Sequence, residues 1–349
     1  MLAYLLKRIL LMIPTLVGVV TLTFIVIQFV PGGPVEQMMM ELKGRGGGGE
    51  ASGGGAEYRG RRGVDAERIK EIQALYGFDK PPLERYWMML KRFAQFDLGQ
   101  SYFQHRSVWE LVKSKLPVSV SLGLWTFFLT YLISVPLGIA KAIRAGSRFD
   151  VVTSMVVLVG YAIPGFVLGV LLLVLFGGGT FVQWFPLRGL TSDDWQELSL
   201  MGKVMDYLWH LVLPITASVV GSFAVVTMLT KNAFLEEIRK QYVLTARAKG
   251  LSERRVLWKH IFRNALIPLV TGFPAAFIGA FFTGSLLIET LFSLDGLGLL
   301  SYEAVLRRDY PVVLGTLYLF TLIGLVTRLI SDLCYVLVDP RIHFEGMPR

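Results

Sequence analysis

Charged residues are scarce in this sequence, since only 17% of its 349 residues are Asp, Glu, Lys or Arg while 53% are hydrophobic. Soluble domains carry roughly 25% charged residues, so a large water-soluble core is not expected. Apolar runs of about 20 residues, the length needed to cross a bilayer, recur along the chain. The composition therefore predicts several membrane spans rather than a single anchor.

Cysteine and histidine are also scarce. The single cysteine, Cys334, cannot form an internal disulfide or a cysteine metal cluster. The histidines fall in different regions and lack the spacing of metal ligands; they are His105, His210, His260 and His343. No glycine-rich loop ends in Gly-Lys-Ser or Gly-Lys-Thr. These absences argue against redox chemistry, a metal site and ATP hydrolysis, so no cofactor is expected on this chain.

Six spans are predicted from the apolar runs. All six should be helical, because lipid offers no partner for unpaired backbone groups. Their expected ranges are 9–30, 116–142, 151–176, 211–229, 265–288 and 312–336. The first run follows Lys7 and Arg8 as a signal peptide would, but it lacks a small-residue cleavage site and is interpreted as a retained span. Prolines within the runs, Pro164 among them, predict kinks.

Lys and Arg residues are concentrated in the loops after the second and fourth spans. Short loops rich in Lys and Arg stay in the cytoplasm, so both termini are expected there as well. The same rule accounts for the net charge of +9 without binding to nucleic acid. The chain is therefore predicted to start and end on the cytoplasmic side.

The segment 31–115 is the longest one predicted outside the cytoplasm. Its stretch 44–55, GRGGGGEASGGG, has great backbone freedom and nothing to bury, which predicts a flexible linker. A phosphate-binding loop is the alternative, but neither the Lys-Ser or Lys-Thr ending nor a preceding buried strand is present. Residues 64–77 have helical periodicity. The expected domains are 1–30, an extracytoplasmic subdomain 31–115, and a five-span core 116–349.

The loop 230–263 is too long and too patterned for a simple connector. Its apolar side is expected from Phe234, Ile238 and Leu244. Gly250 is placed to end that helix, and Ser252 to cap a second one. The loop therefore predicts two short helices that meet at a glycine.

Two uses of this loop are open from its residues alone. A basic amphipathic helix can lie on anionic lipid, whereas the small residues Ala246 and Ala248 favour close approach of another protein. The segment 246–250 and four residues after it resemble the EAA signature, by which importer permeases dock on a nucleotide-binding subunit; those four are His260, Arg263, Asn264 and Pro268. Leu244 stands where the signature has Glu, a departure that is usual in the peptide branch.

Other stretches resemble the dipeptide and oligopeptide branch of binding-protein-dependent ATP-binding cassette permeases, in the family's order along the chain. They are VPGGPV from residue 30, YGFDKPPLERY from 76, DLG from 97, GSLLIETLFSLDGLGLLSYEAVLRRDYPVV from 284 and DLCYVLVDPRI from 332. The variant PGGP, the glycine-rich insertion and the ending DPRIHFEG are similar to the Yej-type group. That group is associated with import of peptides, including microcin C.

The resemblance implies an all-α membrane protein with the six-helix type I importer permease fold, in the bacterial cytoplasmic membrane. It implies a transport subunit and not an enzyme. The implied partners are a second homologous permease, two ATPase subunits that hold ATP and magnesium, an extracytoplasmic peptide-binding protein and membrane lipid. The residues expected to couple to the ATPase are Ala246, Arg247, Ala248, Lys249 and Gly250.

Few charged residues lie within or at the ends of the predicted spans, because charges are costly in lipid. Arg328 and Asp332 are four residues apart, which favours a local ion pair. Glu289 lies at the external end of the fifth span, where a gate, a binding-protein contact and an interfacial carboxylate without a special role all remain open.

Two other classes of membrane protein compete with an importer subunit. A passive channel would also have several spans, but it would not need a paired-helix docking loop. An intramembrane enzyme would need an arrangement such as His-Glu-x-x-His within a span, and none is present.

Overall fold

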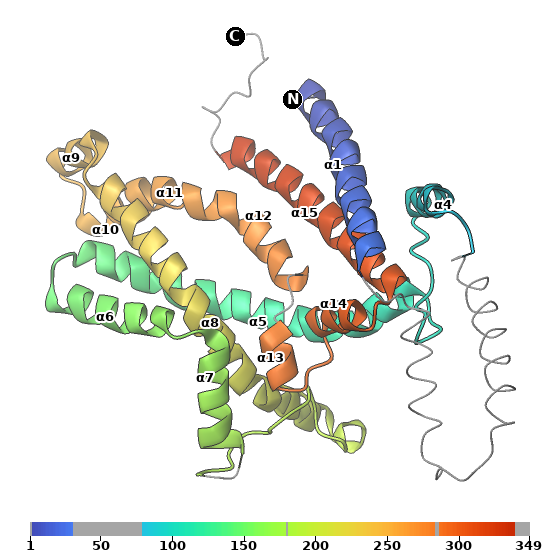
Figure 1. Ribbon diagram of the computed structural model, residues 1–349. Coiled ribbons are helices and arrows are strands. Elements are labelled where there is room, and N and C mark those ends of the chain that lie inside the picture. Colours follow the sequence, from blue (N-terminus) through green and yellow to red (C-terminus); the bar gives the residue numbers. More distant parts are fainter. Residues whose placement is uncertain (1, 31–78, 179–180, 283–285, 339–349) are drawn as a thin grey trace, which may run out of the picture. The chain divides into compact units, whose positions relative to one another are not determined.

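The computed structural model describes residues 2–30, 79–178, 181–282 and 286–338, which form helices joined by loops (Figure 1). The linker 44–55 and the helix 64–77 predicted above lie outside these residues. The α-helices are α1 Leu2–Phe29, α4 Pro82–Ala94, α5 Val108–Ile143, α6 Arg148–Ala162, α7 Gly165–Leu172, α8 Leu200–Ile238, α9 Gln241–Ala248, α10 Glu253–Arg255, α11 Phe262–Ala265, α12 Ile267–Phe282, α13 Leu286–Leu291, α14 Leu297–Leu306 and α15 Tyr310–Val338. Two π-helices, η1 Leu173–Gly177 and η3 Val256–Ile261, and one short 3-10 helix, η2 Trp195–Glu197, complete the set.

Within the described residues, four helices are long and apolar enough to cross a membrane: α1, α5, α8 and α15. Two bent pairs also qualify, Arg148–Ala162 with Gly165–Gly177 and Glu253–Ala265 with Ile267–Ala280. Six spans result if each bent pair is counted as one span. The all-α membrane fold is thereby confirmed.

The third predicted span, 151–176, is wrong as a continuous helix. It is broken between α6 and α7, whose axes differ by 90°. Ile163 is extended, with φ −85° and ψ 117°, and Pro164 precedes α7. A residue before proline is driven out of the helical region by a clash with the proline ring, so the chain turns here. The five prolines Pro14, Pro117, Pro136, Pro214 and Pro274 lie inside helices without ending them.

The fourth span starts earlier than predicted, because α8 begins at Leu200 rather than near residue 211. The Ser199 side chain caps this helix by accepting a hydrogen bond from the Gly202 backbone N–H at 3.2 Å. A serine in this position satisfies one of the donors that a helix start leaves unpaired. The cap lies in the polar stretch before the apolar run, which explains why hydrophobicity alone placed the start too late.

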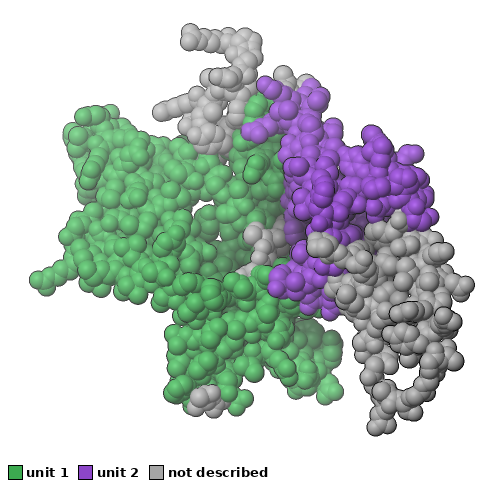
Figure 2. Space-filling view, in the orientation of Figure 1, with its two compact units in different colours: residues 1–5, 115–299, 323–349 green, residues 6–114, 300–322 purple. Residues whose placement is uncertain are grey.

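The chain divides into two compact units, shown in different colours in Figure 2. Unit 1 comprises the described parts of 1–5, 115–299 and 323–349, and unit 2 those of 6–114 and 300–322. The division groups segments from different parts of the sequence. The predicted domain boundaries at residues 30 and 115 stay predictions.

Two hydrophobic clusters can be described among the residues of unit 1 that the structure covers. The first joins α5, α7 with η1, α8, and α13 with the residues after it; it contains Leu122, Leu173, Leu211, Leu213, Ile215, Ala217, Ile288, Phe292 and Leu294. The second lies around the loop 230–263 and contains Ile139, Ala142, Phe234, Val243, Ala246, Val256, Ile261 and Ala265. We call the second group the loop cluster. It fixes the loop against two of the long helices, α5 and α8.

Unit 2 is held by contacts between distant segments. The Tyr318 hydroxyl of α15 donates to the Phe93 carbonyl of α4 at 3.1 Å, and their rings lie 5.0 Å apart. The buried Asp309 carboxylate accepts hydrogen bonds from the Ser101 hydroxyl and the Tyr102 backbone N–H. These contacts place α4 and the loop after it against the start of α15.

Candidate functional site

The loop 230–263 begins with a helix break that the sequence did not predict. The helix expected to run from Phe234 to Gly250 is instead two helices, because α8 ends at Ile238 and α9 begins at Gln241. Glu237 stabilises the turn between them. Its carboxylate pairs with the Lys240 ammonium and accepts a hydrogen bond from the Tyr242 hydroxyl at 2.6 Å.

The position of the Tyr242 hydroxyl beside Glu237 changes its pKa. Burial, together with its hydrogen bond to Glu237, raises the pKa of Tyr242 to about 12. The phenol therefore keeps its proton at any physiological pH. As a neutral donor it can hold the carboxylate, which a phenolate would repel.

Gly250 ends α9, as predicted. Its φ is +76°, a value that L residues rarely adopt. The Gly250 N–H donates to the Arg247 carbonyl at 2.9 Å, and the Leu251 N–H reaches back to the Ala246 carbonyl at 3.4 Å. This pair of bonds is the Schellman motif, which satisfies the last carbonyls of a helix and reverses the chain.

The second predicted helix is also present and starts after Ser252. Ser252 occupies the N-cap position of this helix, as predicted, but its side chain makes no capping hydrogen bond. Glu253 forms a two-pronged ion pair with Arg247 of α9, with N–O distances of 2.8 and 3.0 Å. Both side chains are substantially exposed, 38% and 72%, so the pair adds little stability. It links α9 to α10 across the glycine turn.

One face of α9 packs into the loop cluster. Val243 and Ala246, three residues apart, are buried there against α5, α8 and η3. Leu244 is 51% exposed, so its predicted place on the apolar side is wrong. The break after Ile238 changes the helical register, and the inward positions shift to Val243 and Ala246.

The opposite face of α9 and the turn after it are exposed. Of the five predicted coupling residues, the structure places Arg247, Ala248, Lys249 and Gly250 together on this surface. Ala246 lies beneath them in the loop cluster and is only 6% exposed. The exposed surface is small and positively charged, and it includes the glycine turn that ends α9. We call residues 241–255 the knob. Its role in coupling stays a prediction.

A buried ion cluster lies close to the same base. The fully buried Lys141 ammonium of α5 lies 3.0 Å from the Asp150 carboxylate of α6. Lys231 of α8 pairs with the same carboxylate at 2.7 Å. Asp150 also accepts a hydrogen bond from the Gly146 N–H at 3.0 Å. We call Lys141, Asp150 and Lys231 the ion triad, and it ties three helices together at one end.

The Lys141 ammonium also donates hydrogen bonds to three other oxygen atoms. It donates to the Asp150 carbonyl and the Thr153 hydroxyl at 2.8 Å, and to the Ser154 hydroxyl at 2.7 Å. From the sequence, Lys141 and Lys231 are expected only as two of the Lys and Arg residues that mark the cytoplasmic loops after the second and fourth spans. A signal existed, because Asp150 is an acidic residue at the start of an apolar run, where an unpaired charge would be costly.

Glu289 of α13 is fully buried in unit 1. Its carboxylate accepts a hydrogen bond from the Leu299 N–H at 2.7 Å. A Cβ at Gly296 would lie 2.5 Å from the Glu289 carboxyl carbon, so only glycine fits there. The Leu297 N–H donates to the Ser119 hydroxyl of α5 at 2.8 Å. Glu289 therefore holds the segment 294–299 in place, while the predicted gate or binding-protein contact stays a prediction.

Asp332 of α15 is hydrogen-bonded to α1. The Tyr4 hydroxyl of α1 donates to the Asp332 carboxylate of α15 at 2.8 Å. The predicted ion pair of Asp332 with Arg328 stays a prediction. Within the described part of the chain, no three His, Cys, Asp or Glu residues are grouped so as to hold a metal ion.

Comparison with known proteins defines the class to which this fold and loop belong. The family model of the binding-protein-dependent transport system inner membrane component matches residues 134–344. This match covers more than half of the chain and includes α6 to α15 and the knob. The chain belongs to this family and is a multi-pass permease component of an ATP-binding cassette importer.

Curated relatives narrow the class. The chain is 55% identical to the peptidoglycan transport system permease protein YejB of Agrobacterium fabrum strain C58, over 98% of both chains. It is 54% identical to the inner membrane ABC transporter permease protein YejB of Escherichia coli O157:H7, over 99% of both. The di/tripeptide transport system permease protein DppB of Pseudomonas aeruginosa strain UCBPP-PA14 is 34% identical, over 99% of this chain and all of that one. The predicted similarity to Yej-type permeases is confirmed.

A solved structure is also similar. It is a chain of the MetNI methionine ABC transporter in an inward-facing conformation, with 16% sequence identity and a TM-score of 0.47. The likeness covers 66% of this chain and 96% of that chain.

Proposed function

We propose that this chain forms part of the translocation pathway of an ATP-driven peptide importer and that its knob is the contact with the ATP-hydrolysing partner. The substrate class rests on the relatives, whose names assign di/tripeptides and peptidoglycan as cargo. Peptide bonds are common to both. The chain itself is a transport subunit, and ATP and magnesium belong to the partner subunits.

The proposed assembly has four kinds of component. This permease pairs with a second, homologous permease, and two ATP-binding cassette subunits bind on the cytoplasmic side. An extracytoplasmic binding protein delivers the peptide. Both termini of this chain face the cytoplasm, which follows from the Lys and Arg residues of the loop 230–263.

The observation that carries the coupling role is the division of α9 into two faces. One face, Val243 and Ala246, is buried in the loop cluster with α5 and α8. The other, with Arg247, Ala248 and Lys249, is exposed. Close-packed interiors transmit displacement because they deform little. A push on the exposed face therefore moves the cytoplasmic ends of two spans with it.

Directed cross-linking in the reconstituted importer tests this contact. Cys334 is first replaced by Ser, and Ala248→Cys then supplies a single thiol on the knob. We expect a cross-linker with a maleimide at one end and a photoreactive benzophenone at the other to join this thiol to the ATPase subunit. The matched control is Asp193→Cys, an exposed residue of unit 1 that precedes α8, whereas Ala248 follows it.

The outcomes are distinct. Cross-linking of Ala248→Cys but not of Asp193→Cys supports the contact, and uptake of labelled peptide into vesicles that contain the complex supports the cargo. Failure of an ATPase to co-purify with the chain would overturn the proposed function. Cross-linking from Asp193→Cys alone would overturn the assignment of the knob.

A further inference from the structure

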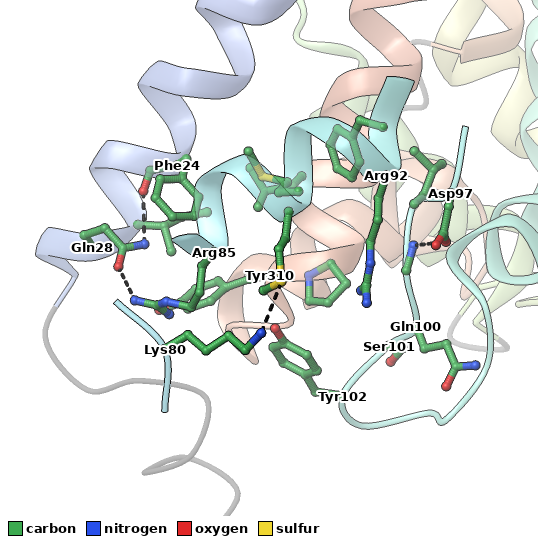
Figure 3. Close-up of a pocket in the computed structure, with 18 of the residues that line it drawn as sticks. Phe24, Gln28, Lys80, Arg85, Arg92, Asp97, Gln100, Ser101, Tyr102 and Tyr310 are labelled. Carbon is green, nitrogen blue, oxygen red and sulfur yellow. Dashed lines mark hydrogen bonds between the residues drawn. The ribbon is translucent and has the colours of Figure 1, made fainter. Parts of the chain in front are cut away.

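Unit 2 contains a pocket of about 780 Å³ whose wall is built from four segments. They are the last turns of α1, the helix α4 with Lys80 just before it, the loop that follows α4, and the first turns of α15. Figure 3 shows this pocket and the side chains that line it. None of its residues belongs to the knob, the ion triad or the segment around Glu289.

Three cations line the pocket: Arg85, Arg92 and Lys80, of which Lys80 is ion-paired with Glu84 at 3.1 Å. Arg85 and Arg92 extend from α4 to the same side (Figure 3), and Arg85 donates to the Gln28 side-chain oxygen at 2.8 Å. Among the described lining residues, Asp97 carries the one carboxylate, and it accepts a hydrogen bond from the Gly99 N–H. Cations gathered around a confined space attract an anion.

The pocket lies where two spans end. Phe24, Ile27 and Gln28 belong to the last turns of α1, which stops at Phe29, and Tyr310 begins α15. Arginine, lysine and tyrosine at the ends of spans lie at the level of the lipid headgroups. The pocket is therefore placed at the boundary between hydrocarbon and water.

Apolar surface next to the pocket extends along α1 and α4. On α1, Leu22, Ile25, Val26 and Phe29 are exposed, and Phe29 is 81% exposed. On α4, Leu83 and Trp87 are exposed beside the charged residues. An acyl chain can lie along such a surface while its headgroup is held by the cations. A small soluble anion would gain nothing from it.

We propose that this pocket binds the headgroup phosphate of an anionic phospholipid. Arginine presents parallel N–H donors that match phosphate oxygens, and two arginines and a lysine face the same space. The phenol side chains of Tyr102 and Tyr310 line the remaining wall, and a phenol hydroxyl can donate to a headgroup oxygen, whereas the Ser101 hydroxyl donates to Asp309. The lipid fastens α1 to α4 and α15 within unit 2.

The test uses the full-length protein purified in a neutral detergent and stripped of bound lipid. Dioleoyl-phosphatidylglycerol is titrated while the melting temperature is followed, with dioleoyl-phosphatidylcholine and inorganic phosphate in parallel. We expect a saturable rise with phosphatidylglycerol at concentrations about tenfold below those needed for phosphatidylcholine. Arg92→Gln should weaken the apparent affinity roughly tenfold, the factor for one lost charge-assisted hydrogen bond.

Arg92 is exposed, so its replacement should not disturb folding, and Arg85→Gln serves as the second variant. The matched control is Lys91→Gln, which removes a neighbouring charge of α4 that does not line the pocket. Equal effects of the two lipids would overturn recognition of the charge. Equal effects of inorganic phosphate would overturn a lipid as the source. An unchanged affinity in Arg85→Gln and Arg92→Gln, or an equal loss in Lys91→Gln, would overturn the pocket.

Discussion

Asp150 shows how single residues join the helices of unit 1. Each buried ion costs several kcal/mol to remove from water, and only complete pairing offsets this cost. Asp150 has Lys141, Lys231 and the Gly146 N–H around its carboxylate. Lys141 in turn has three oxygen acceptors besides that carboxylate. The members of the ion triad therefore depend on one another.

We expect Asp150→Asn to lower the free energy of unfolding by about 3–5 kcal/mol, because the buried ammonium of Lys141 and the partly buried one of Lys231 are then left without their counterion. Lys141→Met should cost less, since Asp150 keeps its pair with Lys231. Unfolding of the purified protein in micelles by increasing SDS measures both. Asp193→Asn, an exposed carboxylate of unit 1, is the control and should change little. A loss with Lys141→Met as large as that with Asp150→Asn would contradict this order.

Tyr242 gives the loop a dependence on alkaline pH. Its pKa is raised in the folded state to about 12, so its stabilising contribution is fully present below the ordinary value of 10 and is lost as pH rises through about 12. The melting temperature should therefore fall more steeply between pH 10 and 12 in the native protein than in Tyr242→Phe. Thermal scans at a series of pH values measure this difference, and parallel curves would count against it.

At the same scale, the sequence identified the residue types of the site but not their partners. Gly250 and Ser252 were predicted as the end of one helix and the start of the next, because helix ends follow local rules. The pairing of Lys141 with Asp150 depends on how α5 and α6 pack, which no local pattern encodes. The wrong placement of Leu244 on the apolar side also comes from a feature that no local pattern encodes, the helix break after Ile238.

The knob is an element whose shape depends on one backbone angle. Gly250 has φ +76°, and no atom lies within 4 Å of a Cβ added there. The cost of a side chain is thus conformational and not steric. We expect Gly250→Val to lower stability by about 1–2 kcal/mol, and Gly250→Asn by less, because Asn tolerates the left-handed region.

In the assembled importer the same two variants should separate insertion from transport. Gly250→Val should still insert in the membrane but take up less peptide and show weaker substrate-stimulated ATP hydrolysis, because the turn no longer holds α9 against α10. Gly250→Asn is the matched variant at the same position and should keep most of both activities. Native levels of uptake and hydrolysis with Gly250→Val would contradict a role of the knob in coupling.

Among the elements, the long apolar helices were predictable and the breaks between helices were not. The range predicted for the last span, 312–336, differs from α15 by two residues at each end. The sequence predicted only a kink at Pro164. The structure shows a break there, whereas α5 and α8 continue through Pro136 and Pro214. Whether a proline ends a helix depends on whether its neighbours can satisfy the freed carbonyls, which is a tertiary property.

For the whole molecule, family membership follows from features spread along the entire sequence. The relatives match over nearly its full length, so the arrangement of spans and the loop 230–263 belong to one inherited plan. The orientation of this plan in the membrane rests on the distribution of Lys and Arg. This orientation decides whether the knob lies in the cytoplasm, where an ATPase subunit can bind it.

We therefore expect the two ends of α8 to lie on opposite sides of the membrane, with the knob inside the cell. In a Cys334→Ser background, Lys249→Cys and Asp194→Cys each supply one exposed thiol, one after α8 and one before it. In intact spheroplasts an impermeant maleimide should label Asp194→Cys and leave Lys249→Cys unlabelled until the membrane is opened. A helix that spans the bilayer cannot present both thiols to one side, so labelling of both in intact cells would contradict the assignment of α8 as a span. Labelling of Lys249→Cys alone would place the knob outside, where no ATP-hydrolysing subunit can reach it.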